Sequence, residues 1–259
     1  MIPPPDFLLS LFPADVAYVW GGTREPVEFR LAPEEAEIIA GKVSARRREE
    51  FTLGRACAHQ ALIELAQTPG VVALPMPTES GRVSHTLGRV GRAPDWPKGV
   101  VGAITHSHGA AAAAVARGEH YLGVGLDIEP ESESLHRVAS RICRPEELKA
   151  LDGLPEPMRM AWLAVTFSIK ESIFKALNPA TGIYLGFQDA LVYQNVEQNG
   201  EHRPLAPGVS GNLGWQLLKD CGSDFPVGFT GPAAFQRQAG WVLTGVWLPG
   251  GNISYAPSK

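Results

Sequence analysis

The stretch Gly123-Val124-Gly125-Leu126-Asp127-Ile128-Glu129-Pro130 joins a short apolar run to a pair of carboxylates. An apolar run of this length, bounded by turn-forming residues, is typical of a buried β-strand and predicts one over 122–128. Side chains two positions apart point to the same face of a strand, so Asp127 and Glu129 share one face. Ile128 takes the opposite face, which we expect to belong to the core.

Helical periodicity appears on both sides of this strand. Apolar residues recur at helical spacing over 44–67, with Ser44 as the expected N-cap, and over 157–177, where Asn178-Pro179 is expected to end the helix. Shorter helices are predicted from Pro33 and over 145–152. Further strands are predicted over 16–20, 100–105, 110–116, 189–196, 213–219, 225–230 and 240–248, and residues 68–99 are expected to form loop with short strands.

Helices and strands are therefore predicted both before and after about residue 120. We expect an α+β fold of two lobes, residues 1–120 and 121–259, joined in one globule. The composition agrees, since 44% hydrophobic and 19% charged residues among 259 exclude a disordered chain. A net charge of −4 argues against a uniformly basic nucleic-acid binder.

Cysteine usage and the N-terminal sequence bear on the compartment. The three cysteines are far apart and form no Cys-x-x-Cys pair, which predicts free thiols in a reducing cytosol. The first fifteen residues lack a basic region and contain four prolines, and no run of about 18 apolar residues occurs. We expect no signal peptide, no membrane span and a cytoplasmic protein.

The carboxylate pair indicates a cation site. Adjacent carboxylates repel unless a cation or a proton intervenes, and Mg²⁺ prefers carboxylates together with phosphate oxygens. An isolated Asp-x-Glu is more often a solvated strand end, so its context matters. In the second long helix Glu171 and Lys175 share a face at i, i+4, which in isolation would be an ordinary surface ion pair. In one cleft with Asp127 and Glu129 they would form a metal and phosphate site.

Positive charge is concentrated at the start of the first long helix. Arg46, Arg47 and Arg48, followed by Arg55, suit bidentate phosphate contacts. A helix surface held by salt bridges to neighbouring glutamates is the alternative. After the strand over 100–105, His106 could donate to a phosphate, although a lone histidine in a loop is more often structural.

In this order along the chain, these segments resemble the 4′-phosphopantetheinyl transferases. The resemblance is to the group that includes the enterobactin-synthetase component D and the surfactin-synthetase activators, and it covers about residues 40–250. The matching segments are Arg47-Arg48-x-Glu50-Phe51-x-x-Gly54-Arg55-x-Cys57-Ala58, Pro94-x-Trp96-Pro97-x-Gly99-x-x-Gly102-x-Ile104-Thr105-His106, Gly125-x-Asp127-Ile128-Glu129 and Phe167-Ser168-x-Lys170-Glu171-Ser172-x-x-Lys175.

The resemblance implies two similar lobes related by a pseudo-twofold axis, with the active site between them. It implies coenzyme A as co-substrate, Mg²⁺ as cofactor, and transfer of the 4′-phosphopantetheine arm to a serine of an apo acyl or peptidyl carrier protein. The other product is adenosine 3′,5′-bisphosphate, and the pathway served would make siderophores, fatty acids or polyketides. Mn²⁺ is expected to substitute for Mg²⁺, because both take oxygen ligands.

The resemblance also assigns roles to individual residues. The N-terminal lobe is expected to grip the coenzyme A nucleotide, the C-terminal lobe to carry the metal site and the transferase motif, and the protein to be a monomer. Asp127, Glu129 and Glu171 match the metal site, Glu171 and Lys175 the catalytic positions, and Arg47, Arg55, Arg92, Thr105, His106 and Lys175 the coenzyme A contacts.

Two other classes of protein remain to be weighed. A non-catalytic module that binds a carrier protein or coenzyme A would have no need for the acidic residues of a metal site. A different nucleotide-dependent Mg²⁺ enzyme is a further alternative, but the chain has no Gly-x-x-x-x-Gly-Lys-Ser/Thr loop, which argues against the P-loop class.

Overall fold

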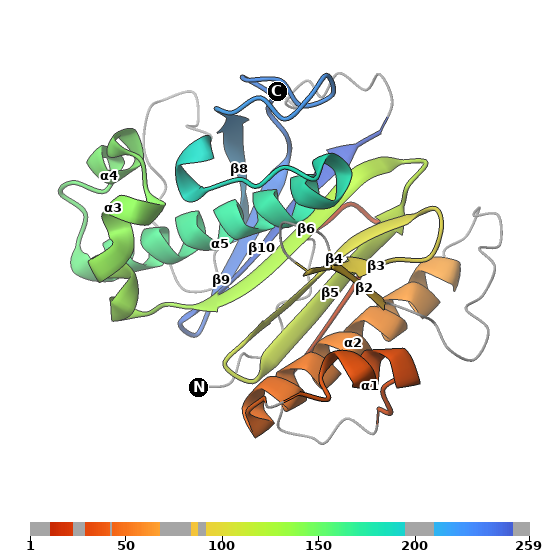
Figure 1. Cartoon of the computed structure of the whole chain (residues 1–259). Helices are drawn as coiled ribbons and strands as arrows, with labels where there is room; N and C mark the ends of the chain where they lie inside the picture. Colours follow the sequence, from red (N-terminus) through yellow and green to blue (C-terminus); the bar gives the residue numbers. More distant parts are fainter. Residues whose placement is uncertain are drawn as a thin grey trace.

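The computed structural model describes residues 11–22, 29–41, 43–67, 84–87, 92–194 and 210–250. Within these ranges, each long helix is followed by a run of consecutive strands (Figure 1). The strands are β1 (Ala17–Gly22), β2 (Ser84–Leu87), β3 (Arg92–Asp95), β4 (Val100–Ser107), β5 (Ala110–Arg117), β6 (Tyr121–Pro130), β7 (Ala190–Gln194), β8 (Ser210–Leu217), β9 (Ala233–Gln238) and β10 (Trp241–Pro249). The helices are α1 (Pro33–Ile38), α2 (Ala45–Gln67), α3 (Ala139–Ile142), α4 (Pro145–Ala150) and α5 (Glu156–Thr181), with short 3₁₀ helices η1 (Glu133–Val138) and η2 (Phe187–Asp189).

Two antiparallel sheets form the centre of the molecule. One has the strand order β1-β5-β4 and the other β6-β10-β9-β8-β7, while β2 and β3 pair separately. Helix α2 packs on the outer face of the first sheet, where Ala58 and Ala61 meet Val115. Helix α5 packs on the second sheet, where Ile169 and Ile173 are fully buried. The expected α+β class with two similar halves is confirmed, and the assignment of a separate task to each half stays a prediction.

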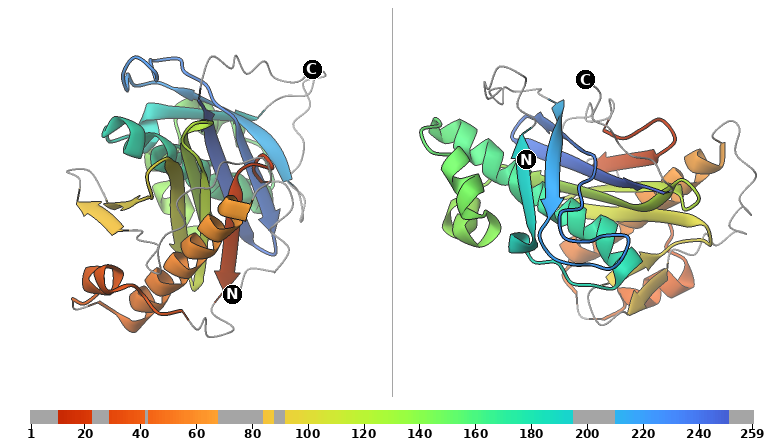
Figure 2. Two further views of the ribbon diagram at one scale, coloured as in Figure 1. Left: turned by 90° about the vertical axis from the view of Figure 1, so that its right-hand side faces the viewer. Right: turned by 90° about the horizontal axis from the view of Figure 1, so that it is seen from above.

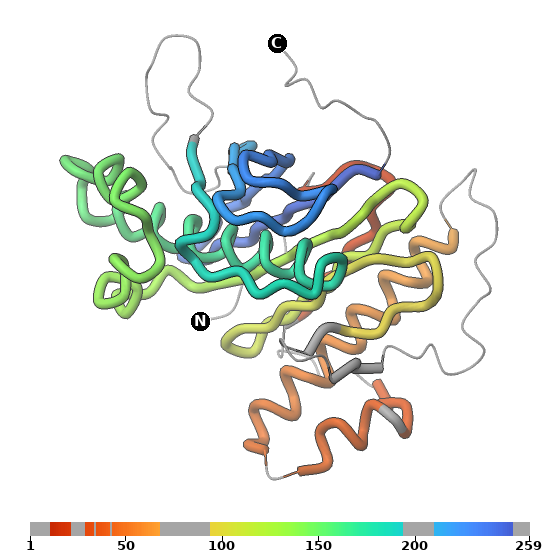
Figure 3. Tube along the Cα trace, turned by 45° about the horizontal axis from the view of Figure 1, so that its top comes forward, coloured from red at the N-terminus to blue at the C-terminus, as the bar shows by residue number. Residues whose placement is uncertain are grey.

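A third apolar cluster fills the space between the two sheets. It joins the even-numbered alanines of β5 to Leu126, Ile128 and Trp241. The alanine-rich strand 110–116 consists mostly of a poor strand former. It is nevertheless the central strand of its sheet and is buried along its whole length, since only small side chains fit between α2 and the opposite sheet. Figures 1 and 3 show α2 and α5 on opposite sides of the strands.

Two of the boundaries expected from the sequence are wrong. Residues 225–230 are not a strand: Gly228 has φ +88°, and Phe225 packs edge-on against Phe229 with ring centroids 5.2 Å apart. The strand lies later, as β9. Helix α5 also does not end at Asn178, because a proline in the last turn removes only one N–H group. The helix continues to Thr181 and ends at Gly182, whose φ of 67° is left-handed.

The other predicted helices and strands are present in the described ranges, whereas residues 68–83 and 88–91 of the predicted loop and 195–196 of the predicted strand 189–196 lie outside them. The helices at Pro33 and Pro145 are α1 and α4, and the segment before α5 adds α3 and η1, which lie at the N-terminal end of α5, away from α2 (Figure 2). The three cysteines are free and buried. None of the helices in the described part combines the length and the apolar character that a membrane crossing requires.

Candidate active site

Glycines on β6 determine how closely α5 approaches the carboxylate strand. The odd-numbered side of β6 faces α5, and a Cβ atom on Gly125 would lie 1.8 Å from the backbone oxygen of Ser172. On Gly123 it would lie 2.2 Å from the oxygen of Ala176. Backbone therefore packs on backbone at these two positions, as only glycine allows. The helical residues Glu171 and Lys175 consequently lie beside the acidic end of β6.

Asp127 is the most enclosed residue of this acidic end. It is 3% exposed, and its Oδ1 accepts hydrogen bonds from Lys175 Nζ at 2.7 Å and from Thr105 Oγ1 at 2.9 Å. Lys175 Nζ also donates to the carbonyl of Leu126 at 3.1 Å. The second oxygen, Oδ2, is buried without a hydrogen-bond partner. A buried carboxylate oxygen of this kind is costly unless something binds it, so it marks an open ligand position.

Glu129 and Glu171 complete the acidic group. Ser107 Oγ donates to Glu129 Oε2 at 3.3 Å, but burial, followed by repulsion from Asp127 and assisted by Glu171, raises the pKa of Glu129 to about 8. Burial, and after it the charge of Asp127, also raises the pKa of Glu171, while Lys175 acts in the opposite direction. The three carboxylates therefore repel one another, and this repulsion disfavours their ionised forms unless a cation is bound.

The acidic group fits the chemistry of a hard divalent cation. Its donors are carboxylate oxygens, one of them is unpartnered, and their mutual repulsion is what a positive ion would relieve. Lys175 already supplies one positive charge at Asp127. Among the described residues, no three His, Cys, Asp or Glu side chains are arranged as a ready metal-binding group. The residues thus suit Mg²⁺ in their chemistry, and their assignment as its ligands remains a prediction.

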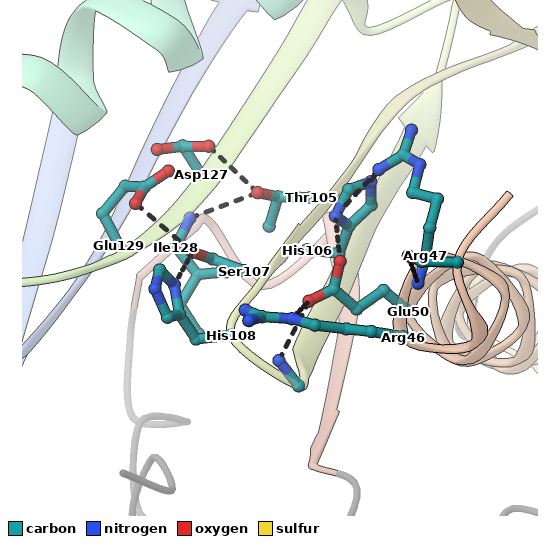
Figure 4. A network of polar contacts seen from close by, with 12 residues as sticks. Arg46, Arg47, Glu50, Thr105, His106, Ser107, His108, Asp127, Ile128 and Glu129 are labelled. Atoms are coloured by element: carbon teal, nitrogen blue, oxygen red, sulfur yellow. Dashed lines mark hydrogen bonds and ion pairs between the residues drawn. The ribbon is translucent and has the colours of Figure 1, made fainter.

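A second polar network lies beside the first, at the start of α2 (Figure 4). Arg47 is exposed, and its NH1 contacts Nε2 of His106 at the end of β4. Ser44 caps this end of the helix by accepting from the backbone N–H of Arg47 at 3.2 Å, as expected. Strand β4 lies beside β6, and the contacts of Thr105 and Ser107 with the β6 carboxylates join the two networks. His106 and Asp127 are thereby held on adjacent strands.

Three of the residues that were expected to contact coenzyme A are not seen on an open surface of the site. Thr105 is 2% exposed and acts on Asp127, so it lies behind the acidic group rather than on an open surface. Arg55 is 1% exposed, with Nε 3.9 Å from Glu35 Oε1 and its guanidinium 5.0 Å from the ring centroid of Phe51. Arg92 belongs to β3, and its side chain lies outside the described residues. The structure therefore brings together Arg47, His106, Lys175 and the carboxylates, with Arg55 deeper in the fold.

Sequence reasoning gave no site role to two residues that the structure connects to this region. Glu50 contacts His106, and Ser107 binds Glu129. Lys170, next to Glu171 in the sequence, has its contacts outside this region: it is buried and donates to Glu147 Oε2 at 2.6 Å, linking α5 to α4. The helical spacing of Glu50 from Arg46 and the two-residue spacing of Ser107 from Thr105 were the available signals.

A cavity of about 240 Å³ is connected to the acidic group through Lys175, which donates to Asp127. Lys175 lines it on one side, and Trp96, Val100 and Leu122 supply apolar surface. A ligand whose phosphate meets Lys175 could place a neighbouring, less polar part in this cavity.

Comparison with known proteins identifies the family. The sequence model of the 4′-phosphopantetheinyl transferase superfamily matches residues 123–229, and that of the 4′-phosphopantetheinyl transferase N-terminal domain matches residues 34–116. The chain is 33% identical to 4′-phosphopantetheinyl transferase Npt of Nocardia iowensis, over 74% of this chain and 83% of that protein. It therefore belongs to the 4′-phosphopantetheinyl transferase superfamily.

Two further relatives carry the same family name. 4′-Phosphopantetheinyl transferase Svp of Streptomyces mobaraensis is 40% identical over 64% of this chain and 61% of its own length. 4′-Phosphopantetheinyl transferase PptT of Mycobacterium tuberculosis is 34% identical over 65% of this chain and 67% of its own. The match with Svp thus spans less than two thirds of that relative.

Proposed function

We propose that this protein transfers the 4′-phosphopantetheine arm of coenzyme A to a serine of an apo acyl or peptidyl carrier protein, with Mg²⁺ as cofactor and adenosine 3′,5′-bisphosphate as the other product. One observation carries the proposal: in a member of this family, Asp127, Glu129, Glu171 and Lys175 lie together at the meeting of β6 and α5. We also propose that it acts as a monomer in the cytoplasm.

Charge neutralisation is the first requirement of this chemistry. The pyrophosphate of coenzyme A repels an incoming serine oxygen, and Lys175 is suited to offset that charge because its ammonium group already faces the acidic end of β6. Asp127, Glu129 and Glu171 would hold Mg²⁺, which supplies Lewis-acid stabilisation of phosphate oxygens when bound. Thr105 and Ser107 fix the carboxylates of β6 through their hydroxyl groups.

Proton removal from the serine is the second requirement. Glu171 is half-buried, and burial together with Asp127 raises its pKa, which makes its carboxylate a better proton acceptor near neutral pH. We therefore propose Glu171 as the general base, acting directly or through a water molecule. The serine itself comes from the carrier protein, so this chain needs no nucleophile of its own.

In this proposal, residues of the N-terminal half bind the nucleotide of coenzyme A. Arg47 and His106 are suited to a phosphate group because the exposed Arg47 guanidinium lies beside the half-buried His106 imidazole near the end of β4. We propose Arg55 and Arg92 as further nucleotide contacts, on the strength of their motif positions. The cavity between Trp96 and Lys175 is the proposed space for an apolar part of the cofactor.

The experiment follows both products of one reaction. Purified protein is incubated with coenzyme A, Mg²⁺ and an apo carrier protein, and chromatography measures adenosine 3′,5′-bisphosphate while mass spectrometry measures the modified carrier. We expect equal amounts of the two, no reaction in excess chelator, and recovery with Mn²⁺. Tight binding of coenzyme A without either product would instead indicate a non-catalytic binding module.

A further inference from the structure

Glu50 is a buried acid in the basic start of α2. Its side chain is 10% exposed, whereas the neighbouring Arg46 side chain is 60% exposed. Oε1 accepts from Arg46 Nε at 3.0 Å and from the backbone N–H of Gly109 at 3.2 Å. Oε2 lies 3.5 Å from Nδ1 of His106, an ion-pair distance (Figure 4). One carboxylate thus holds the first turn of α2, the β4–β5 turn and His106.

The charge of Glu50 is maintained despite its enclosure. Burial alone would raise its pKa, but the hydrogen bonds from Arg46 and Gly109, together with the nearby His106, outweigh burial and lower that pKa. A carboxylate that remains ionised and is fixed by two donors is a rigid acceptor. It therefore imposes an orientation on the imidazole next to it.

Both ring nitrogens of His106 have charged neighbours. Nδ1 lies 3.5 Å from Glu50 Oε2 and 3.3 Å from Arg47 NH1, and Nε2 contacts the same Arg47 nitrogen. The other charged groups acting on the ring are Lys175 from α5 and Asp127 from β6. Burial, followed by the charge of Arg47, lowers the pKa of His106. The lowered pKa favours the neutral ring. Because a guanidinium only donates, a neutral ring accepts from Arg47 at Nε2 and carries its proton on Nδ1, beside the Glu50 carboxylate.

We propose that Glu50 is a positioning residue for an anion site: it holds His106 through Nδ1, so that His106 takes up a proton on Nε2 when a phosphate group binds between His106 and Arg47. Solvent or buffer supplies the proton, an N–H bond forms at Nε2, and no bond between heavy atoms forms or breaks. A phosphate cannot accept from the Nε2 lone pair, but it accepts from an Nε2–H group, and the imidazolium is then stabilised between the Glu50 carboxylate and the phosphate. The proposal rests on the proposed function for the source of the phosphate, which is the nucleotide end of coenzyme A.

Adenosine 3′,5′-bisphosphate is the probe, because it carries the nucleotide phosphates without the pantetheine arm. Calorimetric titrations at pH 7.5 in buffers of different ionisation enthalpy measure the protons taken up on binding. For the wild type we expect uptake of about one proton per nucleotide, as linkage requires of a group that is neutral when free and charged when bound. Glu50→Gln should bind about tenfold more weakly, as expected for loss of a charged contact, and take up less than about half a proton.

Glu49→Gln is the matched control, since Glu49 is the exposed neighbour of Glu50 on the same helix. It should keep the affinity and the proton uptake of the wild type. Glu50→Asp, which retains the charge, should recover part of the uptake, and thermal melting of each variant checks that it is folded. A role for Glu50 confined to helix packing would lower the melting temperature of Glu50→Gln and leave its proton uptake unchanged.

Two results would overturn the proposal. One is wild-type proton uptake in folded Glu50→Gln; the other is wild-type uptake in His106→Gln, which would place the proton elsewhere. Failure of the proposed function is distinguishable. A protein that binds the bisphosphate with Glu50-dependent uptake but modifies no carrier keeps this inference and loses the transferase proposal, whereas normal transfer without proton uptake does the reverse.

Discussion

Replacing Gly125 by alanine tests how the site is built. The new Cβ would lie 1.8 Å from the backbone oxygen of Ser172, a separation that real contacts do not reach, so α5 and β6 must move apart by at least about 1 Å. Overpacking of this kind costs roughly 1–3 kcal/mol, which for a chain of this size lowers the melting temperature by roughly 2–12 °C. Because α5 carries Glu171 and Lys175, the movement also separates them from Asp127.

The expected catalytic effect exceeds the effect on stability. A misplacement of about 1 Å can reduce turnover by roughly a hundredfold, and we expect that loss in kcat for carrier modification. Gly41→Ala is the matched control, since a Cβ at Gly41 meets nothing within 4 Å. Thermal melting and a steady-state transfer assay are run on both variants. If Gly125→Ala retained wild-type Tm and kcat, the close packing of β6 on α5 could not be what positions the site.

Three further substitutions address separate parts of the account. Asp127→Asn keeps the shape of the side chain but removes the charge next to Lys175. It should lower kcat by at least about a hundredfold with a small change in Tm. A transfer rate near that of the wild type at saturating Mg²⁺ would show that Asp127 is not a metal ligand. Lys170→Met should lower the free energy of unfolding, measured by denaturant titration, by about 3–5 kcal/mol, because it leaves Glu147 charged and buried. An unchanged denaturation midpoint would refute the structural role of the Lys170–Glu147 ion pair. Arg47→Ala should raise KM for coenzyme A about tenfold to a hundredfold and reduce discrimination against dephospho-coenzyme A. Equal discrimination by the variant and the wild type would show that Arg47 does not contact the 3′-phosphate.

The fold was largely predictable because its signals are local. Period-3.6 patterns located α2 and α5, and the apolar run before Asp127 located β6. The failures also have local causes. Residues 225–230 are apolar like a strand, but Phe225 packs against Phe229, and Phe229 packs against Trp215, within a turn. The helix α5 passes Pro179 because a proline in the last turn removes little hydrogen bonding.

The candidate site was predictable only in part. Spacing along one element revealed Asp127 with Glu129, since such pairs follow the period of a strand. Contacts between elements distant in sequence left no such signal. One example is the hydrogen bond between Gly109 and Glu50, which are 59 residues apart in the sequence. The pairing of Lys170 with Glu147 is another. The burial of Arg55 beside Glu35 likewise depends on how α1 packs on α2.

The most direct test of the central claim is the intact mass of an apo carrier protein. A panel of apo acyl and peptidyl carrier proteins is incubated with coenzyme A, Mg²⁺ and either the wild-type protein or Asp127→Asn, and each carrier is weighed by mass spectrometry. The account predicts that the wild type adds the mass of one phosphopantetheine to the acceptor serine of at least one carrier, and that the variant adds little in the same time. No mass gain on any carrier, with the same carriers modified by a known 4′-phosphopantetheinyl transferase, would contradict it.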